Sequence, residues 1–259
     1  MEKSRVKNSF LIATNRDYNK HAKIVVDQLE SYGALNNGEI IICCPFSIDD
    51  ERINYVKDEK CLNGNTAFNV AATHATGEFI YILCDDHYVP KSILKGGEFL
   101  NSPTFLNRKF KIASIYSGGV CHIGAIPNFP ETNFIARNVM CRFPFFTREM
   151  YAEHLNGFVF HPNFDICSHF ADNYLSYFLA INGEPAIECD YIKLIPLPET
   201  DQFDDGSVEP FGGSEKKYPT GYIESLSVYL ELCRNLKKGD SHVSLDKRLG
   251  WLSRGRKHD

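Results

Sequence analysis

The stretch GEFIYILCDDHYVP, residues 77–90, decides the fold and marks a candidate site. Its apolar run, FIYILC at 79–84, has the length of a buried strand and stops against Asp85, Asp86 and His87. Strands buried in a parallel sheet read as continuous hydrophobic runs, and open parallel sheets bind ligands beyond the carboxyl ends of their strands. The two carboxylates and the imidazole are therefore expected at a ligand-binding edge.

A simple turn is the alternative interpretation of these polar residues. Aspartate is a favoured turn residue, and Pro90 follows shortly after. A turn needs one aspartate, however, and not two with a histidine beside them. We therefore favour a binding site.

The segments before this stretch alternate between strand-like and helix-like patterns. SFLIAT at 9–14 and IIICC at 40–44 are apolar runs of strand length, and a second helix is predicted in NGNTAFNVAATHATG at 63–77. Between the two strands, apolar residues recur at helical spacing, at Ala22, Val25, Val26 and Leu29. This order predicts a βαβαβ unit over the first ninety residues, and thus an α/β fold with a mainly parallel sheet flanked by helices.

Three stretches taken in order resemble a known family. SFLIATNR, GEIIICCPFSID and GNTAFNVAATHATGEFIYILCDDHYVP resemble the nucleotide-sugar-binding half of family 2 glycosyltransferases, which have the GT-A fold. In that family the second helix opens with residues of the kind found as Gly64, Ala67 and Asn69, and the strand after it ends in a DxD-like motif. The resemblance implies a GT-A-like, Rossmann-like mixed sheet, and it rests on the order of the motifs rather than on any single one.

The same resemblance assigns roles to residues. It implies a nucleoside-diphosphate sugar as donor, and a glycan or another hydroxyl compound as acceptor. Asp86 is the expected metal ligand, helped by Asp85 or His87, and carboxylate oxygens suit the Mn²⁺ or Mg²⁺ that would stabilise a departing diphosphate. An imidazole ligand favours Mn²⁺. The residues expected to bind the donor are Thr14, Asn15, Arg16, Cys44, Asn69 and Asp85.

The chain departs from the family at two points. The second strand usually ends in aspartate, one of which reads the nucleotide base, whereas Cys44 is followed here by Pro45 and Phe46. Only Asp49 or Asp50 could substitute, with a different geometry. The metal motif can be aligned either as Cys84 to Asp86 or as Asp85-x-His87.

The segment 138–184 resembles the acceptor half of the family, with a helix carrying Arg148 and Glu149 and a Gly157-Phe158 step before a second helix. In the family that second helix begins with Glu-Asp, and its aspartate is the catalytic base of an inverting reaction. Ala171 replaces the glutamate, and Asp172 keeps the aspartate. The alternative is that Asp172 only interacts with the helix dipole, which is worth about 0.3–1 kcal/mol.

Other histidines offer further candidate ligands. His161, Asp165 and His169 are spaced like metal ligands on a helix, but Pro162 interrupts the stretch, so we do not expect a zinc site. Related enzymes complete the metal shell with a downstream histidine, which would be His242 here. A solvated basic tail with a stray histidine is the alternative.

Composition limits the remaining possibilities. The 259 residues carry a formal net charge of −5, which argues against nucleic acid as the main partner, and no apolar run is long enough to span a membrane. The nine scattered cysteines include no C-x-x-C pair, and the first residues show no secretory signal, so we expect a cytoplasmic protein. One GT-A-like domain is expected over 1–236, with halves 1–90 and 91–236, followed by a basic tail at 237–259.

Three functional points stay open at this level. The polar segment at 199–221 is expected to be either disordered or a loop that closes over the donor. The chain could bind nucleotide sugars without turnover, because of the changes at Cys44 and Ala171. A nucleotidyltransferase is less favoured, because ATNRDYNKH at 13–21 lacks the glycines of a phosphate-binding loop.

Overall fold

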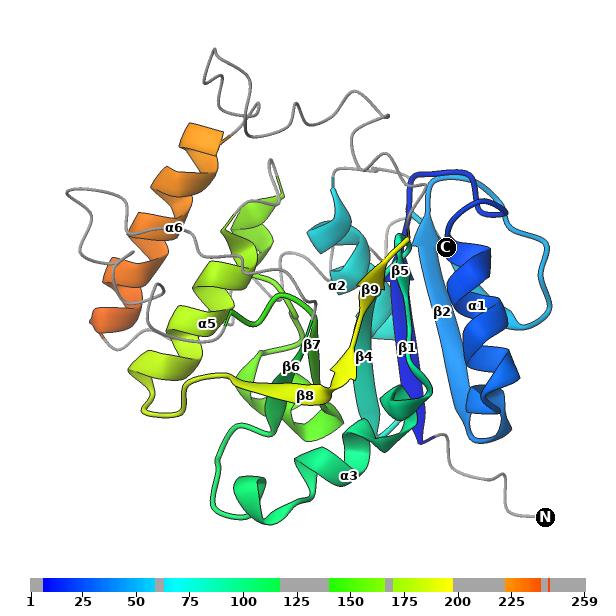
Figure 1. Ribbon diagram of the computed structural model, residues 1–259. Helices are drawn as coiled ribbons and strands as arrows, with labels where there is room; N and C mark the ends of the chain where they lie inside the picture. The colour runs from blue at the N-terminus through cyan, green and yellow to red at the C-terminus, as the bar shows by residue number, and fades with distance from the viewer. Residues whose placement is uncertain are drawn as a thin grey trace.

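The computed structural model describes residues 7–58, 63–116, 140–165, 170–197, 222–238 and 242. Within these ranges the chain forms a seven-stranded sheet, a separate two-stranded ribbon and helices packed against the larger sheet (Figure 1). The predictions made for 199–221, for His169 and for most of the 237–259 tail lie outside the described residues.

The described strands are β1 Asn8–Ala13, β2 Gly38–Cys44, β3 Ile53–Lys57, β4 Phe79–Cys84, β5 His87–Tyr88, β6 Ile112–Tyr116, β7 Pro144–Thr147, β8 Ile187–Lys193 and β9 Ile195–Pro196. The described α-helices are α1 Ala22–Ser31, α2 Gly64–His74, α3 Gly96–Leu100, α5 Ala171–Ile181 and α6 Tyr222–Lys237. Short 3₁₀ turns cover Ala34–Asn36, Lys91–Lys95, Pro103–Phe105 and Pro162–Phe164, and a π-helical turn covers Met150–His154.

The large sheet has the strand order β3-β2-β1-β4-β7-β6-β8. Strands β3, β2, β1 and β4 are mutually parallel, and β6 is parallel to β8. Strand β7 runs antiparallel to both of its neighbours. The sheet is therefore mixed and mainly parallel, as the sequence predicts.

Both faces of the sheet are covered, and the side-chain alternation along its central strands shows how. In β1, Phe10 and Ile12 face the apolar cluster that includes α1, while Leu11 faces the cluster that includes α2 and α5. Strand β4 divides its side chains in the same way. Because neighbouring residues of a strand point to opposite faces, a continuous apolar run is what a strand buried on both sides requires.

The predicted βαβαβ unit is confirmed, with one addition. β1, α1, β2, α2 and β4 form at the predicted positions, and the side chain of Asn63 caps α2 by accepting a hydrogen bond from the Thr66 N–H at 3.1 Å. The sequence did not predict β3, which pairs with β2 at the edge of the sheet. Its five residues, INYVK, give too short a pattern to stand out.

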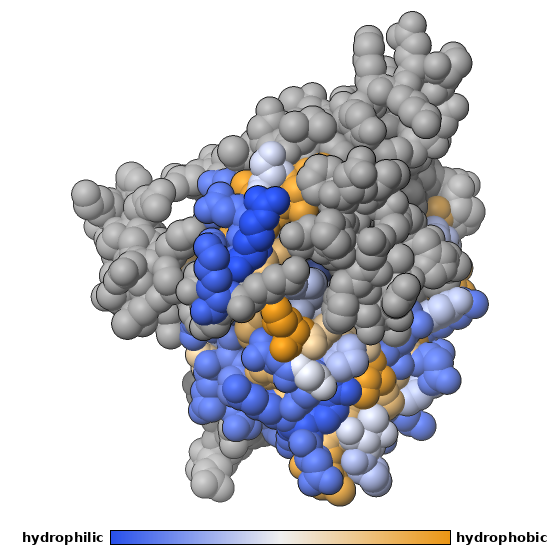
Figure 2. All heavy atoms as spheres, turned by 90° about the vertical axis from the view of Figure 1, so that its left-hand side faces the viewer, coloured by the Kyte–Doolittle hydropathy of each residue, from blue (hydrophilic) through white to orange (hydrophobic). Residues whose placement is uncertain are grey.

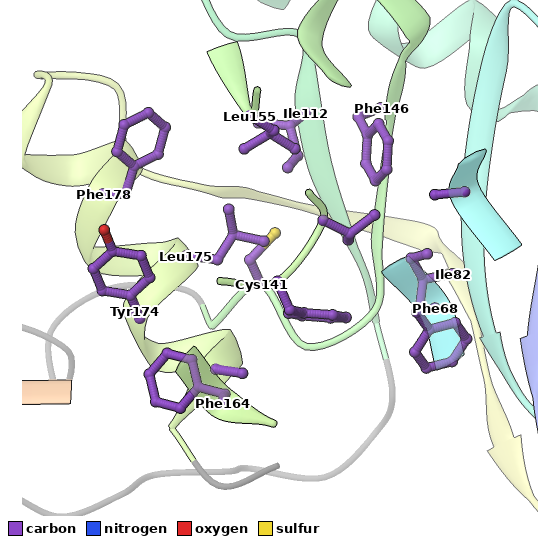
Figure 3. Packing of buried hydrophobic residues seen from close by; sticks show 14 of the residues in the cluster. Phe68, Ile82, Ile112, Cys141, Phe146, Leu155, Phe164, Tyr174, Leu175 and Phe178 are labelled. Atoms are coloured by element: carbon purple, nitrogen blue, oxygen red, sulfur yellow. The ribbon is translucent and has the colours of Figure 1, made fainter. Parts of the chain in front are cut away.

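Helix α5 is the main element of the second half. It projects Tyr174, Leu175 and Phe178 into the core, where they lie near Cys141 and Leu155 (Figure 3). Helix α6 packs against α5, and Phe170 stacks on Tyr229 with ring centroids 5.6 Å apart.

On the face that carries α5 and α6, the described residues visible at the surface are mainly hydrophilic (Figure 2). Among the described residues, no helix is long and apolar enough to cross a membrane.

Candidate functional site

The site is built on the carboxyl ends of two adjacent parallel strands, β1 and β4. Their last residues, Ala13 and Cys84, are partners in the sheet register, so the loops that follow start side by side. The Thr14 hydroxyl donates a 2.5 Å hydrogen bond to Asp85 Oδ2 and accepts one of 3.1 Å from the Arg16 backbone N–H. The structure thus brings Thr14 and Arg16 together with Asp85, which is 71 residues from Thr14 along the chain.

Arg16 supplies positive charge at this edge. Its Nη1 atom lies 3.9 Å from Asp85 Oδ1 and 3.7 Å from Asp86 Oδ2. This nitrogen is buried, and it has no hydrogen-bond partner among the described residues. Buried guanidinium nitrogens are nearly always hydrogen-bonded, so the arrangement suits an additional oxygen ligand such as a phosphate.

Asp86, His87 and Cys84 form the group of donors best suited to a metal. One ligand atom from each lies within 4.8 Å of the others, and Asp86 Oδ1 is 2.5 Å from His87 Nδ1. It is the only group of three or more such donors within the described ranges. Oxygen, nitrogen and sulfur donors at this spacing fit a divalent cation.

The pKa values of the two aspartates move in opposite directions. Burial dominates at Asp85 and raises its pKa, against the opposing effects of Thr14 and Arg16. At Asp86, burial also favours the protonated form, but the hydrogen bond and charge of His87, with the charge of Arg16, outweigh it and lower the pKa. Asp86 is therefore the carboxylate that stays ionised.

A two-stranded ribbon fixes the backbone of this cluster. β5, which contains His87, pairs with β9, and the Leu197 N–H donates a 2.9 Å hydrogen bond to the Asp86 carbonyl oxygen. The segment 187–196 therefore forms both β8 at the sheet edge and β9 beside the candidate metal ligands.

Residues 140–143 connect this cluster to α5. Because β7 runs antiparallel to β4, the residues that precede β7 lie near the carboxyl end of β4. Phe143 meets the His87 ring edge-on with centroids 5.5 Å apart. The Cys141 N–H donates a 2.8 Å hydrogen bond to Ser176 Oγ, which donates one of 2.7 Å to the Asp172 carbonyl oxygen. This segment therefore spans from the metal donors to the candidate base.

Asp172 lies in the first turn of α5. Its Oδ1 atom accepts a 2.9 Å hydrogen bond from the Asn173 N–H. Burial raises the pKa of the carboxyl, while that hydrogen bond and the charge of Arg142 oppose only part of the rise. A carboxylate with a raised pKa is a stronger base than an exposed one, which suits general-base chemistry.

Arg142 was missed by the sequence analysis. Its guanidinium lies 5.1 Å from the Phe143 ring centroid, and its side chain is exposed. Burial raises the pKa values of the Asp172 carboxyl and the Cys84 thiol, and the charge of Arg142 offsets part of the rise at each group. Arg142 therefore lies within electrostatic reach of both halves of the site. The sequence signal was a single basic residue inside the apolar run VMCRFPFF at 139–146.

The other predicted donor-binding residues occupy varied surroundings. Asn15 is exposed on the loop after β1, and Cys44 is buried at the end of β2 with its thiol bonded to the Phe46 carbonyl oxygen at 3.0 Å. The Asn69 amide is hydrogen-bonded to the backbone of Val159 and Phe160. Asn69 thus joins α2 to the acceptor half, and its donor-binding role stays a prediction.

Asp50, a possible reader of the base, is engaged elsewhere. Its carboxylate accepts hydrogen bonds from Arg52 Nε at 2.8 Å and Nη2 at 2.6 Å, and from the Tyr18 hydroxyl at 2.6 Å. The Arg52 bonds are the main reason that the Asp50 pKa is lowered. Arg52 also pairs with Glu30 and Asp27 of α1. This network fixes the β2–β3 loop to α1.

His242 lies away from the metal donors. Its ring is buried against Tyr174 and Phe178 of α5, with centroids 5.5 Å and 5.0 Å away, and the Tyr174 hydroxyl bonds its carbonyl oxygen at 3.1 Å. His161 lies beside it, with centroids 6.1 Å apart, and accepts a hydrogen bond from the Asn163 N–H. His242 is not part of the donor group formed by Cys84, Asp86 and His87. Asp165 is exposed, and its carbonyl oxygen accepts a hydrogen bond from the Asn63 side chain.

The chain resembles known proteins in structure but not in sequence. No family model matches the chain, and no curated protein is similar to it in sequence. The solved structure of Staphylococcus aureus TarS 1–349 in complex with UDP superposes with a TM-score of 0.53 at 15% identity, over 74% of this chain and 60% of that one. The chain thus spans less than two thirds of that structure.

A mannosyltransferase from Pyrobaculum calidifontis, PcManGT in complex with GDP-Man and Mn²⁺, gives a TM-score of 0.49 at 15% identity, over 97% of this chain and 79% of that one. The mixed seven-stranded sheet and the TarS superposition together identify the fold as GT-A-like.

Proposed function

We propose that the chain is a metal-dependent glycosyltransferase that moves a sugar from a nucleoside-diphosphate sugar to an acceptor hydroxyl, with inversion at the anomeric carbon. The observation that carries this proposal is the convergence at the ends of β1 and β4. There an ionised carboxylate, Asp86, lies beside a buried guanidinium nitrogen of Arg16 that has no hydrogen-bond partner among the described residues. UDP in the TarS complex, on the same fold, supports a nucleotide ligand of this class.

The donor would be held by groups of opposite charge. Arg16 would donate hydrogen bonds to diphosphate oxygens, and Arg142, within electrostatic reach of Cys84 and Asp172, would add positive charge. Asp86 and His87 would hold a divalent cation, which would stabilise the negative charge of the leaving diphosphate. The Thr14–Asp85 hydrogen bond fixes the two loops that carry these groups.

Asp172 would act as the base. Its carboxylate would accept the proton of the acceptor hydroxyl while the oxygen forms a bond to the anomeric carbon and the bond from that carbon to the phosphate oxygen breaks. The electron pair of the broken bond would leave with the diphosphate. Attack from the face opposite the leaving group inverts the anomeric configuration, and the hydrogen bonds through Ser176 and Cys141 fix the turn that carries the base.

The second candidate is a protein that binds nucleotide sugars without turnover. Ala171 and Cys44 favour it, because they stand where the family has acidic residues. Incubation with UDP- and GDP-sugars and a divalent cation, followed by measurement of released UDP or GDP, separates the two. Release that is faster than in the Asp172→Asn variant supports transfer or donor hydrolysis. Binding of the donor without release supports the second candidate.

A further inference from the structure

Cys84 lies at the margin of the apolar cluster that includes α1, where it adjoins two other potential metal donors. It is the last residue of β4, and its Sγ atom lies within 4.8 Å of the ligand atoms of Asp86 and His87. The other described cysteines, Cys43, Cys44, Cys141, Cys189 and Cys233, are buried, whereas Cys84 is partly exposed. With a carboxylate and an imidazole beside it, this thiol can contribute to binding a metal ion, which a cysteine enclosed by apolar side chains cannot.

Three donors of three kinds are brought together here by local geometry. Asp85 and Asp86 form the turn between β4 and β5, and this turn brings the Asp86 carboxylate and the His87 imidazole together beside Cys84, the last residue of β4. The β5–β9 pairing and the Phe143 contact hold the imidazole in place. The donor set is therefore assembled before any ligand arrives.

The chemistry of the set favours one class of cation. Magnesium prefers oxygen donors only, and manganese also favours oxygen, whereas zinc and cobalt bind thiolate, imidazole and carboxylate together. Three protein ligands with one position left open would leave room for a diphosphate oxygen, as in catalytic zinc sites.

We propose that Cys84 is a metal ligand, and that the site binds Zn²⁺ or Co²⁺ in preference to Mg²⁺. On binding, the thiol would release its proton to solvent, the sulfur would form the bond to the metal, and no redox change would occur. The inference rests on the proposed function only in placing this metal beside the donor diphosphate, since the metal is bound by the protein itself.

Cobalt gives a direct spectroscopic test. Co²⁺ titrated into the metal-free protein should produce the near-ultraviolet charge-transfer absorption of a cobalt–thiolate bond. Cys84→Ser should lose this band, because the hydroxyl keeps the shape but not the soft sulfur. Cys189→Ala, which changes a buried cysteine of β8, is the matched control and should keep the band. Circular dichroism checks that each variant is folded.

Affinity provides a second measurement. Competition with a chromophoric chelator should show Cys84→Ser binding Zn²⁺ at least ~10-fold more weakly, the loss that removing even an outer hydrogen-bond partner of a metal ligand causes. Cys84→Asp should shift the preference from Zn²⁺ toward Mn²⁺, since a hard carboxylate replaces the thiolate. Alkylation of Cys84 by iodoacetamide needs no variant and can be monitored by mass spectrometry. Bound Zn²⁺ should slow this alkylation.

The outcomes separate this inference from the proposed function. Co²⁺ binding without a charge-transfer band, or a band that survives Cys84→Ser, would overturn the assignment of Cys84 while leaving UDP or GDP release to test transfer. A wild-type protein that binds none of these divalent cations, with or without UDP or GDP, would overturn it as well. The band in the wild type, its loss in Cys84→Ser and zinc protection of Cys84 together support it, even if no sugar is transferred.

Discussion

Asp86 and Asp172 are both half-buried carboxylates in the proposed site, yet their pKa values shift in opposite directions. At both residues burial favours the protonated acid. At Asp86 the nearby His87 and the charge of Arg16 overcome this effect, whereas at Asp172 backbone hydrogen bonds and the charge of Arg142 offset only part of it. One carboxylate is kept ionised beside His87 and Arg16, and the other is held in surroundings that favour taking up a proton.

The difference assigns a task to each residue. A carboxylate that stays ionised suits cation binding, and one with a raised pKa suits proton transfer. Pairs of acids whose surroundings separate their pKa values are a recurrent feature of active sites. The following predictions test whether the two aspartates differ in this way, from the largest expected effect to the smallest.

Replacement of Asp86 should have the largest effect. Asp86→Ala should lower metal-dependent donor binding by more than ~100-fold, because a direct ligand matters more than the outer partners whose loss costs 10–100-fold. Isothermal titration with UDP and GDP in the presence of the metal measures it. Asp165→Ala, which removes an exposed carboxylate, is the matched control and should bind normally. Retained metal-dependent binding in Asp86→Ala would contradict the assignment.

Asp172→Asn should separate binding from transfer. The amide keeps the shape but cannot accept the proton, so transfer should fall by about 10²–10⁴-fold while donor affinity stays within twofold or so. Steady-state release of UDP or GDP, measured beside the binding constant, gives both quantities. Unchanged transfer would leave Asp172 with a helix-dipole role only.

The raised pKa of Asp172 should be visible in the pH dependence of transfer and in the pH dependence of stability. Transfer should rise with pH as Asp172 ionises, and because its pKa is raised the rise should lie above the ordinary aspartate value of about 3.9. A raised native pKa also means that the wild type loses stability as pH rises through that pKa. Asp172→Asn should therefore gain melting temperature relative to wild type between pH 4 and 7 or so. A constant difference across this range would argue against a perturbed carboxyl.

His242→Phe should have the smallest effect on function. The phenyl ring can keep the contacts with Tyr174 and Phe178, so we expect unchanged metal affinity. Burial lowers the His242 pKa from 6.5 to about 3, so the wild type should lose stability as pH falls below 6.5, where the unfolded chain takes up the proton. The variant should resist that acid loss in thermal melts. Weaker metal binding in His242→Phe would show that the histidine reaches the metal after all.

The sequence predicted elements whose signal is local. FIYILC, the apolar stripe of α1 and the helix in NGNTAFNVAATHATG are local patterns within one element, and each formed as predicted. Strand β3 was not predicted, because five half-polar residues become a strand only by pairing with β2. The same holds for β5 and β9, whose two-residue strands depend on contact between His87–Tyr88 and Ile195–Pro196.

The same distinction between local sequence signals and tertiary contacts applies to the residues of the site. Asp85, Asp86 and Arg16 were predictable, because the carboxyl ends of parallel strands meet at one edge of a sheet. Arg142 was not, because its position depends on β7 running antiparallel to β4, which no local pattern in VMCRFPFF indicates. For His242 the sequence suggested a ligand, and the structure shows a ring packed on α5, a contact that only tertiary packing determines.

Donor binding in three proteins tests the central claim most directly. Thermal unfolding of the wild type, Asp86→Ala and Asp172→Asn should be followed with UDP- and GDP-sugars, each with and without a divalent cation. A donor at 100 times its Kd stabilises the folded state by about 2.7 kcal/mol. We predict a metal-dependent rise in melting temperature for the wild type and Asp172→Asn, and none for Asp86→Ala. No rise in the wild type with any of these donors, or an equal rise in all three proteins, would contradict a nucleotide-sugar site at the ends of β1 and β4.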